Sequence, residues 1–156
     1  MGFIKDIKDE MLRREFNNKY IGLHVSGTTP DAATGANFSE PINAKYRREP
    51  LSVAGTTVSV MDNLELVNGT GTNSRMVKNR RVIEFQPMTS AVTVSHYGIF
   101  SEATGGTPRF LAPLTNAQGQ ATSVEIPANA VFLFDYDATT GTGNFKVEFA
   151  DEDTTS

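Results

Sequence analysis

The residues best suited to chemistry in this sequence are its two histidines, His24 and His96. Imidazole binds metal ions and transfers protons near neutral pH. A histidine-based zinc site needs further ligands, however, and no local spacing supplies them. His96 falls on the same expected strand face as Val92 and Val94, which favours a hydrogen-bonded histidine at the edge of the core. We therefore expect no metal, no cofactor and no catalytic histidine.

Carboxylates gather in the C-terminal part of the chain. Asp135 and Asp137 lie two residues apart, and Asp151, Glu152 and Asp153 follow. Their oxygen atoms suit calcium, but the spacing of a calcium-binding loop is missing. We interpret the first two as solvated acids and residues 151–156 as an acidic tail.

Motifs that would indicate an enzyme are also missing. The glycine-rich segments 69–71 and 141–143 lack the lysine and the helix that a phosphate-binding loop requires. No Gly-x-Ser-x-Gly elbow occurs, and the absence of cysteine excludes thiolate nucleophiles and suits a protein made in the cytosol. We expect a protein that is not an enzyme.

Basic residues form two short clusters, and they are our first docking candidates: Arg47, Arg48, Arg75, Lys78, Arg80 and Arg81. These residues either belong to solvated strand ends or form a patch that docks onto an acidic neighbour. The net charge of −4 and the pI near 5.2 do not favour a nucleic-acid partner, because phosphate binding needs a basic surface.

The N-terminal sixteen residues place apolar side chains along one helical stripe: Phe3, Ile4, Ile7, Met11 and Phe16. This pattern predicts a short amphipathic helix over residues 1–16. The helix is either a lid on the domain's own core or an arm that docks on a neighbouring subunit through Phe3, Ile7 and Met11. No stretch is apolar enough for a signal peptide or a membrane span, so we expect neither export nor insertion into a membrane.

From Tyr20 onward, short runs of β-branched and aromatic residues alternate with clusters of glycine, threonine, asparagine and proline. This rhythm predicts an all-β fold, an antiparallel β-sandwich or jelly roll with a short N-terminal helix, in one domain over residues 17–150. The expected strands lie at residues 21–25, 46–49, 57–60, 81–85, 91–100, 110–114, 121–126, 131–136 and 145–149.

Three segments of the C-terminal half share a pattern with a known group of proteins. They are Val94–Gly106, which contains His96-Tyr97-Gly98-Ile99-Phe100 and the Gly105-Gly106 pair, then Phe110–Leu114, and then Ile126–Val131. This pattern resembles a family of small tailed-phage virion proteins that carry the labels tail fibre or head decoration.

The shared residues predict features of the fold rather than catalytic groups. We expect a bulge or a close backbone approach at Gly98, a hairpin turn at Gly105 and Gly106, and a corner at Pro127. Asn129 replaces the glycine that the family usually has at this corner, and asparagine tolerates a left-handed backbone better than other residues with a Cβ.

The resemblance implies a capsid decoration protein, which would bind the major capsid protein and copies of itself as a trimer or other ring. Such a protein would lie on the capsid surface of the virion and would use no enzyme chemistry, nucleic acid or membrane. The alternative within the same class is a tail, collar or fibre-base component. An alternative from another class is a carbohydrate-binding module, for which Tyr46 and Tyr97 are the candidate stacking residues.

Overall fold

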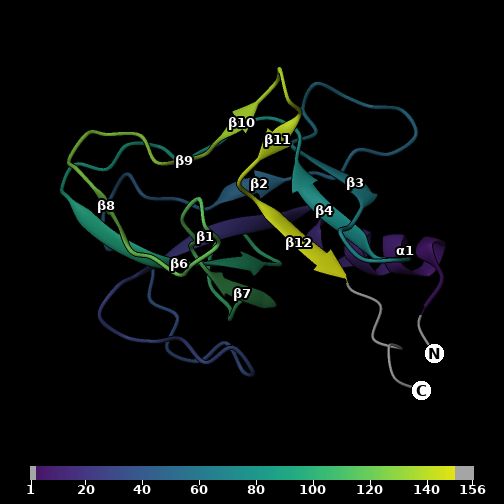
Figure 1. Ribbon diagram of the computed structural model, residues 1–156. Coiled ribbons are helices and arrows are strands. Elements are labelled where there is room, and N and C mark those ends of the chain that lie inside the picture. The colour runs from purple at the N-terminus through teal and green to yellow at the C-terminus, as the bar shows by residue number, and fades with distance from the viewer. Residues whose placement is uncertain (1–2, 150–156) are drawn as a thin grey trace. The chain divides into compact units, whose positions relative to one another are not determined.

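The computed structural model describes residues 3–149, which form two compact units (Figure 1). The first, here called the helical unit, combines residues 3–18, 51–83 and 134–149. The second, called the sheet unit, combines Lys19–Pro50 and Glu84–Leu133. The chain therefore passes several times between the two units.

A five-stranded sheet dominates the sheet unit. Its order is β2 (Glu49–Leu51), β1 (Lys19–Val25), β6 (Val92–Phe100) and β7 (Phe110–Pro113), and β8 (Val124–Ile126) also pairs with β6. The nine-residue β6 pairs antiparallel with β1, β7 and β8, as its content of valine, threonine and aromatic residues favours. The buried side chains of this unit include Ile21, Leu23, Val94, Ile99, Phe100 and Ile126.

Gly98 has a different role from the one predicted. The pairing of β1 with β6 shifts register at one place: His24 lies opposite His96, and the next residue, Val25, lies opposite Val94. The irregularity is therefore at Ser95, and the predicted bulge at Gly98 is wrong. A Cβ atom on Gly98 would lie 2.9 Å from the ring of Phe38. Glycine is required here because an aromatic side chain, rather than a neighbouring backbone, packs against this position.

The predicted turn and corner of the sheet unit are confirmed. Gly105 and Gly106 each have φ of +74° in the connection between β6 and β7. Asn129 has φ of +63°, the left-handed conformation that its replacement of glycine predicts.

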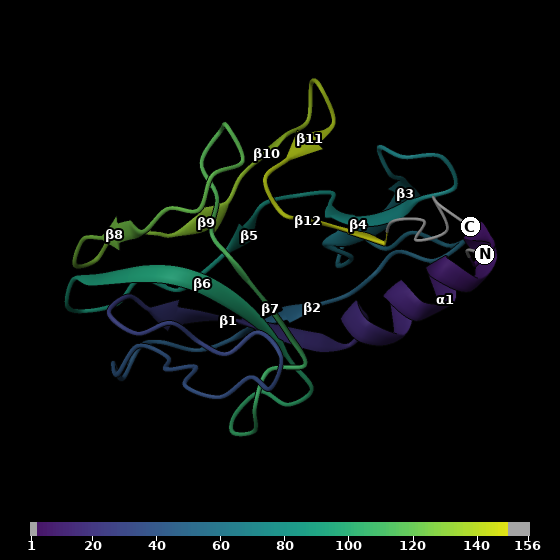
Figure 2. The same ribbon diagram turned by 60° about the horizontal axis from the view of Figure 1, so that its bottom comes forward.

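The helical unit contains the helix α1 (Lys5–Phe16) and an antiparallel sheet of three strands, in the order β12 (Lys146–Phe149), β4 (Arg75–Asn79) and β3 (Leu64–Asn68). Figure 2 shows α1 along one side of this sheet. A small hairpin, β10 (Tyr136–Asp137) with β11 (Thr142–Gly143), precedes β12. The remaining pair, β5 (Ile83–Glu84) with β9 (Leu133–Phe134), lies where the chain changes unit.

The all-β fold with one short N-terminal helix is thus confirmed. Three details differ: residues 46–48 and residues 57–60 belong to loops instead of strands, and the β3–β4 hairpin was not predicted. The sandwich or jelly-roll arrangement and the domain limits at residues 17 and 150 stay predictions, and the acidic tail 151–156 lies outside the described residues. Within residues 3–149, no helix is long and apolar enough to cross a membrane.

Candidate functional site

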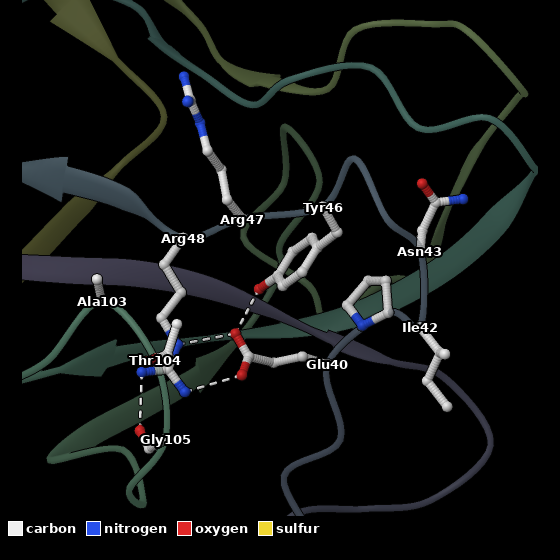
Figure 3. Close-up of a pocket in the computed structure, with 10 residues that line it drawn as sticks. Glu40, Ile42, Asn43, Tyr46, Arg47, Arg48, Ala103, Thr104 and Gly105 are labelled. Carbon is white, nitrogen blue, oxygen red and sulfur yellow. Dashed lines mark hydrogen bonds and ion pairs between the residues drawn. The ribbon is translucent and has the colours of Figure 1, made fainter.

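A pocket of about 400 Å³ lies in the sheet unit (Figure 3). Two segments line it: residues 40–48, from the long connection between β1 and β2, and residues 103–105, from the connection between β6 and β7. Both segments lack regular structure, so side-chain interactions must fix their positions.

Arg48 provides most of these interactions. Its Nε atom donates to Oε1 of Glu40 over 2.9 Å, and its Nη2 atom donates to Oε2 over 2.8 Å. Its Nη1 atom donates to the carbonyl oxygens of Glu102 and Gly105, each over 2.8 Å. The guanidinium carbon also lies 3.5 Å from the centre of the Phe100 ring. One buried side chain therefore joins both segments to the sheet.

Tyr46 completes the network. Its hydroxyl donates to Oε1 of Glu40 over 2.6 Å and accepts the backbone N–H of Leu23 over 3.0 Å. Burial and the hydrogen bond to the Glu40 carboxylate raise the pKa of Tyr46 above its ordinary value. Gly22 is required beside this network, because a Cβ there would lie 2.7 Å from Oε1 of Glu40 and 2.9 Å from the Tyr46 oxygen.

The pocket is suited to a structural role. Glu40, Tyr46 and Arg48 direct their polar atoms at one another, whereas the labelled side chains of Ile42 and Arg47 point away from that network in Figure 3. Among residues 3–149, no group of three histidine, aspartate or glutamate side chains is placed to hold a metal ion. The observed chemistry is that of a clamp between two loops.

The histidines pair with each other in the sheet unit. His24 is fully buried, and its Nδ1 atom accepts the backbone N–H of Ser39 over 2.8 Å while its Nε2 atom lies 2.8 Å from the carbonyl oxygen of Thr28. The Nδ1 atom of His96 lies 2.8 Å from the hydroxyl oxygen of Ser95. This agrees with the expected hydrogen-bonded histidine at the edge of the core.

Of the predicted docking residues at the N-terminus, Ile7 and Met11 belong to α1, whereas Phe3 precedes the helix and packs its ring edge-on against that of Phe149, with the centroids 6.1 Å apart. Phe3 and Ile7 are exposed and Met11 is half-buried, while Lys8, Leu12 and Phe16 face the core of the helical unit. Lys8 is buried because its Nζ atom donates to the carbonyl oxygen of Asn73 over 2.6 Å. The helix thus packs within its own unit, through a face that shares Phe16 with the predicted stripe but has Lys8 and Leu12 in place of Ile7 and Met11. The lid and the docking arm both stay predictions.

The predicted basic residues divide between the two units. Arg47 and Arg48 belong to the sheet unit, and Arg48 is buried in the clamp. In the helical unit, Arg75 pairs with Asp9 over 2.7 Å and Lys78 pairs with Glu65 over 3.2 Å.

Arg80 and Arg81 have a different environment. Their Nη1 atoms donate over 2.8 Å to the carbonyl oxygens of Asp62 and Val60, respectively. The structure therefore joins these two residues to the loop that contains residues 57–60, for which the sequence pattern predicts a strand.

The clamp as a unit cannot be predicted from the sequence. Glu40, Tyr46 and Arg48 are close in the chain, but their arrangement depends on Gly22 and on carbonyl groups more than fifty residues away. Of the two tyrosines considered for sugar stacking, Tyr46 lines the pocket, whereas Tyr97 is buried.

A family model described as "Podophage GP4 fiber I protein gp80" matches residues 14–133. The match covers most of the chain, including both segments of the clamp, and extends much further toward the N-terminus than the resemblance seen in the C-terminal half. No curated protein matches the chain.

Proposed function

Because the chain belongs to the podophage GP4 fiber I protein family, we propose that it is a structural subunit of a phage tail fibre or of the fibre base. The family match over residues 14–133 carries this proposal. Membership of this family means that the chain is a bacteriophage virion structural protein and that its location is the virion.

The structure offers what such a role needs. Antiparallel strands form a scaffold, and long connections are held in place by side chains, as the Arg48 clamp does for residues 40–48. Virion subunits of this kind bind neighbours through preorganised surfaces, which lowers the entropy lost on assembly. Glu40, Tyr46 and Arg48 bond to one another in the pocket, which supports a structural role for these three groups.

The capsid decoration role that the resemblance implies is the alternative location. A decoration protein binds the major capsid protein at many equivalent lattice positions, whereas a fibre subunit occupies a few positions at the tail. A carbohydrate-binding module is the weaker alternative, since burial of Tyr97 leaves Tyr46 as the candidate stacking residue.

The test is to locate the protein in the virion. Particles of the phage that encodes this chain would be compared with particles lacking it, by cryo-electron microscopy without imposed icosahedral symmetry. Quantitative mass spectrometry of the same particles would give its amount relative to the major capsid protein.

We expect density to disappear from the tail fibres or their base, with a low copy number. Loss of a regular density from the capsid lattice, with a copy number close to that of the major capsid protein, would contradict the fibre proposal and support decoration.

A further inference from the structure

Strand β12 (Lys146–Phe149) is the end strand of the three-stranded sheet in the helical unit (Figure 1). One of its edges pairs antiparallel with β4, and no strand within residues 3–149 pairs with the other edge. The backbone groups along the outer edge of such a strand can bind an edge strand of another chain. Their direction, and the side chains beside them, determine which chain fits.

The hydrogen bonds of Phe145, the residue before β12, show which backbone groups point outward. Its carbonyl oxygen accepts the backbone N–H of Asn79 in β4 over 3.1 Å, and its own N–H donates to Oδ1 of Asn79 over 3.3 Å. In an antiparallel strand, the N–H and C=O of one residue point to the same side, and those of the next residue point to the opposite side. Val147 therefore directs its backbone groups toward β4, whereas Lys146 and Glu148 direct theirs outward.

The two residues with outward backbone groups carry opposite charges. When two copies of β12 run antiparallel about a two-fold axis at Val147, Lys146 of each copy lies opposite Glu148 of the other, and these residues exchange both N–H···O bonds. The neighbouring hydrogen-bonding registers would place lysine opposite lysine or glutamate opposite glutamate, and like charges directly opposite each other are destabilising. The charges therefore select the register centred on Val147.

Lys146 lacks a partner for its charge within its own copy. The side chain is exposed, and no carboxylate within residues 3–149 forms an ion pair with it. In the β12–β4 pair, Lys146 lies in register with another lysine, Lys78, which pairs with Glu65 over 3.2 Å. A carboxylate on the outer side of Lys146 would therefore stabilise this edge.

The carboxylate of Glu148 is already held in position. Its Oε2 atom accepts the backbone N–H of Thr70 over 3.2 Å, and its Oε1 atom accepts the hydroxyl of Thr70 over 2.9 Å. No lysine or arginine of residues 3–149 forms an ion pair with it. A carboxylate fixed in this way loses little side-chain entropy when it binds a lysine of another copy.

The face of β12 that carries Val147 and Phe149 is apolar. Both side chains are half-buried, and the ring of Phe149 packs edge-on against that of Phe3, which is 53% exposed. In the register centred on Val147, the two copies of this valine form a pair without hydrogen bonds, in which the Cα atoms lie about 4.5 Å apart. The two valine side chains would therefore cover each other.

We propose that two copies of this chain pair through the outer edges of β12, antiparallel about Val147, so that their sheets join into one. The contact is isologous, because each copy contributes the same residues. It gives a two-fold dimer, whereas the trimer or ring that the resemblance implies would need another contact between copies. This inference is independent of where in the virion the protein is located.

The first test introduces a cysteine at the two-fold axis of the full chain. The chain has no cysteine of its own, so Val147→Cys carries a single thiol. In the proposed register, the two thiols lie within the distance that a disulfide spans. Val131→Cys is the matched control, because Val131 is 45% exposed and belongs to the sheet unit. Under mild oxidation, Val147→Cys should form disulfide-linked dimers at least about tenfold faster than the control, because pairing raises the local thiol concentration.

The second test exchanges the charges, and sedimentation velocity at protein concentrations up to several hundred micromolar measures association. Lys146→Glu should raise the dissociation constant of the dimer by about tenfold or more, since two attractive pairs become repulsive. Glu148→Lys should do the same. A mixture of the two variants should associate like the wild type, because each glutamate at 146 then meets a lysine at 148, and both wild-type residues also stay opposite each other. Lys45→Glu is the control, since it makes the same change of charge at an exposed lysine of the sheet unit.

Four outcomes would overturn the proposal. They are a wild type that is monomeric over the whole concentration range, a dimer that Lys146→Glu leaves intact, a mixture of two folded charge variants that stays monomeric, and equal rates of disulfide formation at positions 147 and 131. Circular dichroism shows whether each variant is folded, and the cysteine test does not depend on the folding of Glu148→Lys. None of these outcomes bears on the fibre proposal, which depends on position in the particle.

Discussion

His24 and His96 lie directly opposite each other in the β1–β6 pair, with ring centroids 5.6 Å apart and ring planes at 80°. The Nδ1 atom of His24 accepts a backbone N–H, so the ring proton is on Nε2, where it is donated to the carbonyl oxygen of Thr28. Two backbone groups therefore set the tautomer of His24, whose ring lies against that of His96.

This arrangement predicts a loss of stability in mild acid. Burial, and to a smaller extent the nearby His24, lower the pKa of His96 below its ordinary value of 6.5. As the pH falls through about 6.5, the unfolded chain takes up a proton at this position before the folded chain does, so the free energy of unfolding decreases. Urea unfolding at pH values from about 7.5 to 5.5 measures this change, and carboxylates contribute little in that range.

The variant His96→Gln tests the assignment, because glutamine keeps a polar side chain but does not titrate. We expect its free energy of unfolding to depend less on pH than that of the wild type over the same range. Parallel curves for the two proteins would mean that His96 does not contribute to the acid sensitivity.

The Arg48 clamp leads to a prediction about stability. Arg48→Met leaves the Glu40 carboxylate partly buried without its bidentate partner, and breaking such a pair costs about 3–5 kcal/mol. The exposed neighbour Arg47 is the matched control, and Arg47→Met should change the free energy of unfolding by less than about 0.5 kcal/mol. Urea unfolding of both variants provides the measurement.

A double-mutant cycle with Glu40→Gln separates the ion pair from the other contacts of Arg48. Each single substitution already disrupts the ion pair between Arg48 and Glu40. The double variant should therefore lose less free energy of unfolding than the sum of the two single losses. If the effects are additive, the stabilisation by Arg48 comes from Phe100 and the loop carbonyls instead.

Local patterns were enough to predict much of the sheet unit. The strands at β1, β6 and β7 follow from runs of β-branched and aromatic residues, which prefer a pleated surface. The Gly105–Gly106 turn and the left-handed Asn129 follow from backbone preferences of single residues. These features depend on few distant contacts, so the sequence alone contains the information.

The helical unit was harder to predict because distant residues determine its structure. Val58 and Val60 alternate with polar residues as a strand would, yet the Asp62 carboxylate accepts the N–H of Ser59 and Arg81 donates to the carbonyl oxygen of Val60, which keeps this stretch in a loop. The hairpin of β3 and β4 was missed because polar residues interrupt both strands. A lysine on the buried side of a helix likewise cannot be predicted without knowledge of the carbonyl group that it reaches.

Asn79 provides a further prediction, in the sheet of the helical unit. This side chain is fully buried; its Nδ2 atom donates to the carbonyl oxygens of Arg81 and Asp135 over 3.1 and 2.9 Å, and its Oδ1 atom accepts the N–H of Phe145 over 3.3 Å. Asn79→Ala removes these hydrogen bonds of a fully buried side chain and should lower the free energy of unfolding by about 2–3 kcal/mol.

The control for this variant is Asn144→Ala, because Asn144 is an exposed asparagine one residue before Phe145. Its effect should stay below about 0.5 kcal/mol in the same urea unfolding experiment. Equal losses in the two variants would show that the buried hydrogen bonds of Asn79 do not stabilise this sheet.

Asn129 gives the last prediction, which isolates a backbone effect. The residue is exposed and has φ of +63°, and its backbone N–H donates to the carbonyl oxygen of Met88 over 2.7 Å. Asn129→Gly preserves this geometry and should leave the free energy of unfolding nearly unchanged. Asn129→Ala forces a Cβ-bearing residue without a local polar group into the left-handed region, which costs about 1–2 kcal/mol. Urea unfolding of the two variants compares them directly, and equal stability would mean that the corner after Pro127 adopts another backbone conformation in solution.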